Sequence, residues 1–243
     1  MILIKKSPAP PELDELKRNA EEQGLSDKEA YNLLRNPLKA QVRDALMREQ
    51  GHLCAYCMRR IPDERISESD EDLSDVYIEH WQARSADRKT GENKGLDYNN
   101  MLAVCSGNEK APSATGKRKK RYFTCDKKRD NAPLKINPLD ASTLETIYYL
   151  SDGTIKSTDE DIEKDINVRL NLNCSEEAVT LPQNRKAVLD AVQADLVSQD
   201  GDWYQKYKEQ LDIWESEDDP KTPYIGIAIW WLKEQIRHLS GEG

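Results

Sequence analysis

Four of the five cysteines in this 243-residue chain constrain its fold more than any other feature. Cys54 and Cys57 form a C-x-x-C pair, a spacing that lets both thiolates reach one tetrahedral Zn²⁺ from a turn. Cys105 and Cys125 can complete a four-cysteine site, although residues 106–124 make them a much looser pair. The sequence therefore predicts a structural zinc site that joins distant parts of the chain.

Other uses of these cysteines fit less well. An odd number of cysteines without an export signal argues against a disulfide framework. A thioredoxin-like redox pair would open a helix after a βαβ strand, whereas Cys57 is followed by Met-Arg-Arg-Ile-Pro62 and an acidic loop. His52 is an alternative fourth ligand, and Cys174 is expected to be an ordinary buried thiol.

The pattern of helix signals and apolar residues predicts an α+β fold that is mostly helical, in three regions. Region 1–50 is helical, with a capping box at Ser26-Asp-Lys-Glu29. Region 51–135 contains a short hairpin with the C-x-x-C pair, a strand from Val76 to Trp81, and a short helix from Asn100 to Cys105. Region 136–243 is mainly helical after a hairpin, with helices expected over 184–197, 203–214 and 224–239.

The charge and hydropathy patterns limit where the chain works and what it binds. No stretch approaches the roughly 20 consecutive apolar residues of a membrane span, so we expect a cytoplasmic protein that does not contact membranes. The net charge of −9 argues against passive binding to a polyanion. One basic segment interrupts this acidic background and is a candidate nucleic-acid contact, although a solvated loop is its alternative. Its members are Lys117, Arg118, Lys119, Lys120, Arg121, Lys127, Lys128 and Arg129.

The residues between the two cysteine pairs carry groups suited to cutting a phosphodiester. His80 ends the predicted strand, where a neutral imidazole can take a proton from water near pH 7. Glu79 and Asp126 offer the oxygen ligands that a Mg²⁺-type ion prefers. Asn100 would orient the imidazole or hold its loop, with a helix N-cap as the alternative role and Asn99 as the alternative residue.

These motifs resemble the HNH endonucleases: a C-x-x-C pair, Glu79-His80, Asn100 before an apolar run into Cys105, and a closing Cys125-Asp126. Downstream segments, such as Ile136-Asn-Pro-Leu-Asp140 and Leu170-Asn-Leu-Asn173, resemble the PtuB-like HNH components of Septu antiphage-defence systems, including those attached to retrons. The resemblance covers about residues 40 to 200.

The resemblance implies a ββα-metal core with a zinc knuckle, flanked by N-terminal helices and a C-terminal helical region. In such a core His80 is the general base, Glu79 a ligand of a catalytic Mg²⁺ or Mn²⁺, and Asn100 the orienting residue. It also implies a PtuA-like ATPase partner and, in retron-linked members, a reverse transcriptase with its DNA product. Many HNH enzymes place a metal-binding histidine just after the last cysteine, where this chain has Asp126. Asp130 and Asn131 are alternative third ligands.

The expected function is therefore that of a metal-dependent endonuclease acting as the effector of an antiphage-defence complex. We expect the acidic C-terminal helices or the apolar 225–232 stretch to dock the partner. The alternative is a catalytically silent zinc-knuckle subunit that binds nucleic acid or acts as an adaptor. The motifs carry no base code, so DNA and RNA, including tRNA, both stay open as substrates.

Overall fold

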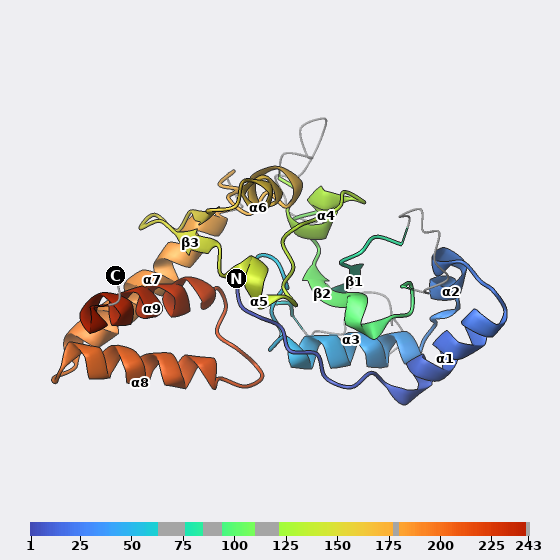
Figure 1. Cartoon of the computed structure of the whole chain (residues 1–243), viewed down its shortest axis with the longest axis horizontal. Helices are drawn as coiled ribbons and strands as arrows, with labels where there is room; N and C mark the ends of the chain where they lie inside the picture. Colours follow the sequence, from blue (N-terminus) through green and yellow to red (C-terminus); the bar gives the residue numbers. More distant parts are fainter. Residues whose placement is uncertain (63–75, 85–93, 110–121, 177–179, 242–243) are drawn as a thin grey trace.

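The computed structural model describes residues 1–62, 76–84, 94–109, 122–176 and 180–241, and in this part of the chain helices combine with two small antiparallel sheets (Figure 1). The α+β class is thus as predicted. The helices are α1 (Pro11–Glu22), α2 (Asp27–Leu33), α3 (Leu38–Glu49), α4 (Cys125–Arg129), α5 (Ala141–Leu144), α6 (Glu160–Lys164), α7 (Leu181–Ser198), α8 (Trp203–Glu215) and α9 (Gly226–Ser240). The strands are β1 (Val76–His80), β2 (Met101–Cys105), β3 (Ile147–Tyr149) and β4 (Ile155–Ser157), with a 3-10 turn η1 (Tyr98–Asn100) and a π-helical segment η3 (Asp165–Arg169).

The predicted N-terminal helices are confirmed. At the start of α2 the Ser26 hydroxyl accepts the Glu29 N–H, and the Glu29 carboxylate accepts the Ser26 N–H at 3.0 Å. This reciprocal capping satisfies backbone donors that have no partner inside the helix. Helix α3 buries Val42, Leu46 and Met47 and packs against β2. The N-terminal helices therefore support the central sheet directly.

Residues 101–105 form strand β2, so the prediction of a short helix there is wrong. All five residues are buried, and they pair with β1 in antiparallel register, with His80 opposite Met101 and Glu79 opposite Leu102. A buried apolar run of this length suits a strand better than a helix. The cap residue Asp97 does act locally, but it caps only η1, which ends before the strand begins. Helix α4 then packs against β2, giving the order strand, strand, helix.

The C-x-x-C segment forms a tight turn that attaches to the C-terminal region. Leu53 bridges Arg60, and the Met58 N–H donates to the Cys54 carbonyl at 2.9 Å, as expected for a short hairpin. The Tyr224 N–H donates to the Met58 carbonyl at 3.0 Å. Met58 also packs in a hydrophobic cluster with residues of α7 and α9. The cysteine turn is therefore fixed between the central sheet and the C-terminal helices.

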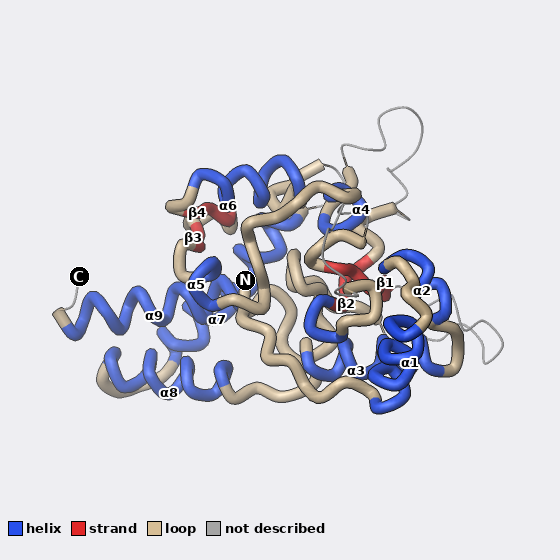
Figure 2. The backbone as a smooth tube through the Cα atoms, turned by 45° about the vertical axis from the view of Figure 1, so that its right-hand side comes forward, coloured by secondary structure: helices blue, strands red, loops and turns tan. Residues whose placement is uncertain are grey.

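The C-terminal hairpin and helices occur where they were predicted, and α8 runs beside α9 in both views (Figures 1 and 2). In the apolar 225–232 stretch, Ile225, Ile227, Ala228 and Leu232 are buried, whereas residues 229–231 are half-buried. The largest hydrophobic core cluster contains residues of all three predicted regions and therefore marks no boundary between them. The boundaries at 50 and 135 stay predictions.

None of the helices in the described ranges combines the length and the apolar character needed to cross a membrane.

Candidate metal centre and adjoining cleft

The four predicted zinc ligands meet in the structure, with all four buried sulfur atoms within 4.8 Å of one another. The Cys54–Cys125 and Cys57–Cys105 sulfur pairs are 3.8 Å apart, and the Cys105–Cys125 pair is 3.9 Å apart. A tetrahedral zinc with Zn–S bonds of about 2.3 Å places its sulfurs about 3.8 Å apart. The donor set and its spacing therefore fit one structural zinc ion.

The alternatives for this cluster do not fit its geometry. None of the five cysteines forms a disulfide, and Cys174 is buried outside the cluster, as an ordinary core thiol would be. His52 is not a fourth ligand, because four cysteines already fill the set and the His52 Nδ1 pairs with the Asp219 carboxylate.

The sulfurs of the cluster differ in how readily they ionise, because contacts with the other cysteines and burial raise the pKa values of the Cys105 and Cys125 thiols well above their usual value. Hydrogen bonds from Cys105, Cys125 and Cys54 hold the pKa of the Cys57 thiol well below its usual value. A bound cation would extend this to all four, because metal ligation displaces thiol protons. Nearby, the Asn108 amide donates to the Tyr122 carbonyl at 2.9 Å. Asn108 thus fixes the chain beyond Cys105 to the chain that leads into Cys125.

Glu79 projects from β1 into a buried environment next to a second carboxylate. Its Oε1 accepts from the Tyr56 hydroxyl at 3.0 Å and from the Arg129 guanidinium, while its Oε2 accepts the His80 N–H at 3.0 Å. Burial, followed by the negative charge of Asp126, raises the pKa of Glu79 to about 8. A carboxylate held close to another carboxylate is stabilised by a cation, and both offer the oxygen atoms that Mg²⁺ and Mn²⁺ accept.

Glu79, His80 and Asp126 line one polar cleft of about 680 Å³. Successive residues of a strand normally point to opposite faces, so Glu79 and His80 can share one site only where the strand ends or twists. Both residues line the cleft at the end of β1, although the Glu79 carboxylate contacts Arg129 of α4 and the His80 ring contacts Tyr31 of α2. The alternative ligands Asp130 and Asn131 also line it.

The imidazole of His80 is held from two sides. Its Nε2 lies 3.0 Å from the Gly95 carbonyl oxygen. A carbonyl can only accept, so Nε2 carries the proton and Nδ1 is the basic nitrogen of the neutral ring. The Tyr31 ring of α2 packs edge-on against the imidazole, with centroids 4.9 Å apart. The ring orientation is therefore set by α2 as well as by the loop that contains Gly95.

The loop at Gly95 can lie against the start of α2 because Gly95 has no side chain. A Cβ at this position would lie 2.1 Å from the Asp27 carbonyl oxygen at the start of α2. Such an overlap would push the loop away from α2 and move the carbonyl that receives the His80 proton donor.

Asn100 acts on the loop and not directly on the imidazole. Its side-chain oxygen accepts the Gln82 N–H at 2.7 Å, and its amide donates to the Gln82 and Lys94 carbonyls at 3.0 and 3.1 Å. It therefore joins the two ends of the 83–93 segment and holds Lys94, next to Gly95, in place. Of its predicted roles, holding the loop is the one that its contacts match, and Asp97 takes the N-cap role. The alternative residue Asn99 is exposed.

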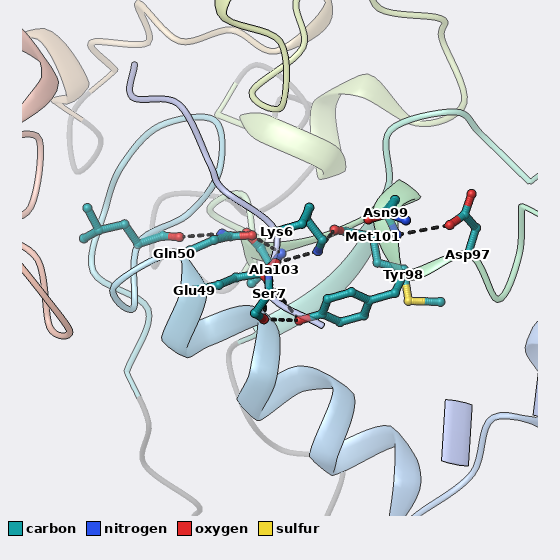
Figure 3. A network of polar contacts seen from close by, with 10 residues as sticks. Lys6, Ser7, Glu49, Gln50, Asp97, Tyr98, Asn99, Met101 and Ala103 are labelled. Carbon is teal, nitrogen blue, oxygen red and sulfur yellow. Dashed lines mark hydrogen bonds and ion pairs between the residues drawn. The ribbon is translucent and has the colours of Figure 1, made fainter. Parts of the chain in front are cut away.

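The turn that carries Asn100 is anchored from α3 and the N-terminal segment (Figure 3). The Glu49 carboxylate accepts from the Tyr98 hydroxyl at 3.0 Å and from the Ser7 N–H at 2.9 Å. The Lys6 ammonium pairs with Glu49 and donates to the Met101 carbonyl at 3.0 Å. Residues far apart in sequence thus fix the entry to β2.

Replacing Asn100 with alanine should destabilise the protein by about 1–3 kcal/mol, because it removes the hydrogen bonds by which the buried Asn100 side chain joins Gln82 to Lys94. Chemical denaturation followed by circular dichroism measures the change. Asn99→Ala is the matched control, and we expect it to change the free energy of unfolding by no more than about 0.5 kcal/mol. Equal effects of the two substitutions would contradict the loop-holding role.

The predicted basic contacts fall into three groups. Lys127 and Lys128 line the cleft, and Lys127 is paired with Glu109 at 2.5 Å. The Arg129 side chain is only 1% exposed and donates to the Trp81 and Ala132 carbonyls as well as to Glu79. Arg129 is therefore a buried link between α4 and β1, and we do not retain it as a phosphate contact. Lys117, Arg118, Lys119, Lys120 and Arg121 lie outside the described residues.

Tyr56 and Tyr31 were not found from the sequence, and Arg129 was expected there as a nucleic-acid contact and not as a partner of Glu79. Tyr56 and Arg129 both hold Glu79, and Tyr31 packs on His80. The position of Tyr56 inside the C-x-x-C pair was the available signal, because a residue there must lie beside the cluster.

A scan against protein-family models finds none that matches this chain, and a search of curated proteins also finds no match.

Proposed function

We propose that the chain is a metal-dependent HNH-type endonuclease that hydrolyses phosphodiester bonds of nucleic acid. The observation that carries the proposal is the meeting of Glu79, Asp126 and His80 in one polar cleft. The adjoining four-cysteine cluster and the succession of β1, β2 and α4 are also what a ββα-metal core with a structural zinc requires.

Each cleft residue has a defined task in this reaction. Glu79 and Asp126 would hold a Mg²⁺ or Mn²⁺ ion, which supplies positive charge for the phosphate oxygens in the transition state. His80 takes a proton from water at Nδ1 while its Nε2–H stays bound to Gly95. The oxygen of that water then forms a bond to phosphorus as the bond to the leaving oxygen breaks. The cleft offers room for the nucleic-acid strand that carries this phosphate.

The ion pair between Glu79 and Arg129 is compatible with cation binding. An ionised carboxylate has about four acceptor sites. Tyr56 and Arg129 donate to Oε1 and the His80 N–H donates to Oε2, so these three donors leave one acceptor site for a cation. Arg129 therefore fixes the direction of the carboxylate, while Asp126 approaches from α4.

We further propose that the protein works in an antiphage-defence complex with a PtuA-like ATPase. Besides the family resemblance, the net charge of −9 supports delivery to nucleic acid by a partner. Helix α8 offers the acidic docking surface, with Glu209, Asp212 and Glu215 exposed near Ile213, which is 59% exposed. Of the two docking surfaces expected from the sequence, we prefer this one because it is the more exposed.

One observation favours a second candidate, a zinc-containing adaptor without catalysis. Arg129 already provides a positive charge for Glu79, so the buried carboxylate does not depend on a divalent cation for charge balance. In that case the cluster and the cleft would serve only to bind nucleic acid or a partner.

Nuclease assays with Mg²⁺ or Mn²⁺ test the proposal, using the chain alone and with the ATPase on plasmid, phage DNA and total RNA. We expect cleavage of at least one substrate and a loss of at least roughly 100-fold in Asp126→Ala, because the cleft loses a cation ligand. The matched control is Asp212→Ala on α8, which should cleave at the wild-type rate when assayed alone. Wild-type protein that cleaves nothing with either metal, in either form, would favour the adaptor.

A further inference from the structure

Arg84 is a positively charged residue that lines the cleft and has no role in the reaction proposed above. It lies four residues after His80 and lines the same cleft as Glu79 and Asp126. Its guanidinium carbon sits 4.1 Å from the centroid of the Tyr31 ring. Among the described residues, no carboxylate forms an ion pair with Arg84.

Two other cations next to the cleft, Lys127 and Arg129, differ from Arg84 because each is paired with a carboxylate. Lys127 is paired with Glu109, and Arg129 is buried against Glu79. Lys128 also lines the cleft, from α4. Arg84 and Lys128 therefore place positive charge on two separate elements around an acidic centre.

The stacking of Arg84 on Tyr31 suits the binding of an oxyanion. A guanidinium presents a planar set of donors that matches two phosphate oxygens, and an aromatic face supports it without using those donors. Because the ring already restricts the side chain, less conformational entropy is lost when a ligand binds. The same Tyr31 ring packs against the imidazole of His80, so it sets the spacing between Arg84 and the imidazole.

We propose that Arg84, positioned by Tyr31, binds a phosphate of the substrate strand next to the phosphate that is cleaved. The proposal rests on the proposed function for the identity of the cleaved phosphate, and it adds that the ligand is a strand with at least two adjacent phosphates. It also makes α2 part of the substrate site, with Tyr31 as a positioning residue.

Binding of a fluorescent oligonucleotide, single-stranded or duplex, tests this in an Asp126→Ala background, which should leave the oligonucleotide uncleaved and keeps His80 packed against Tyr31. Arg84→Met should weaken binding by roughly 10- to 100-fold, the loss of one charge-assisted contact. It should also lower the slope of log affinity against log salt by roughly 0.7 to 0.9. Arg84→Lys should keep the slope but bind more weakly than arginine. The control Arg237→Met removes an exposed cation at the end of α9 and should change neither quantity.

Variants of Tyr31 separate stacking from charge. Tyr31→Phe keeps the aromatic face and should bind like the parent, whereas Tyr31→Ala should weaken binding without changing the salt slope. An unchanged slope and affinity in Arg84→Met would overturn the proposal, even if wild-type protein cleaves nucleic acid. An Arg84-dependent slope in a protein that never cleaves with Mg²⁺ or Mn²⁺ would support the phosphate site and contradict the proposed catalysis.

Discussion

His80→Ala is expected to abolish phosphodiester cleavage while the zinc content stays the same. A general base contributes about 100- to 10,000-fold to such a reaction, and the contact of Nε2 with the Gly95 carbonyl makes Nδ1 the basic nitrogen of a neutral His80. The substitution also removes the contacts with Gly95 and Tyr31, so a moderate loss of stability of about 1–3 kcal/mol should accompany it. Initial cleavage rates, zinc per chain and thermal unfolding measure the three effects separately.

His238→Ala provides the matched control for this prediction, because His238 is exposed in the last turn of α9. It should leave cleavage and stability unchanged. His80→Gln adds a second test, since it retains a polar side chain of similar reach without a basic nitrogen. Cleavage at the wild-type rate in both His80 variants, with zinc retained, would remove the catalytic assignment and favour the adaptor.

The parts of the fold that depend on neighbouring residues could be predicted from the sequence. The capping box at Ser26 is closed within one helical turn, and the C-x-x-C pair needs only a tight turn. The prediction of a short helix over 100–105 was wrong because the structure of this segment depends on residues distant in sequence. Cap-forming residues before an apolar run are typical of a helix start, but pairing with β1 decided the outcome, and that pairing is not local.

The candidate site shows the same limit. Glu79, His80 and Asp126 could be proposed because their chemical types suit metal-assisted hydrolysis. The contacts of Tyr31 with His80 and of Arg129 with Glu79 could not, since each joins the site to a helix about fifty residues away in sequence. The burial of Arg129 was equally hidden, because a run of basic residues normally indicates a solvated face.

Removal of zinc, or Cys57→Ser, is expected to unfold the centre of the molecule. The four cysteines connect the C-x-x-C turn, the end of β2 and the start of α4, so losing the ion releases all three. Structural zinc contributes apparent binding energies of about 10–16 kcal/mol in small zinc-binding peptides, comparable to the whole stability of a typical domain. Cys57→Ser should therefore lose zinc and its cooperative unfolding transition, as measured by metal analysis and urea denaturation.

Cys174→Ser distinguishes this effect from the general loss of a buried thiol. Cys174 is buried but lies outside the cluster, so the substitution should cost only about 1–2 kcal/mol and keep one zinc per chain. Cys57→Ser, unlike Cys174→Ser, should also disturb the cleft. Asp126 directly follows the predicted ligand Cys125, and Glu79 is held by Tyr56 from inside the C-x-x-C turn. Zinc loss should thus abolish cleavage even when Mg²⁺ is saturating. A Cys57→Ser protein that keeps its zinc and its unfolding midpoint would show that the four sulfurs do not form the metal site.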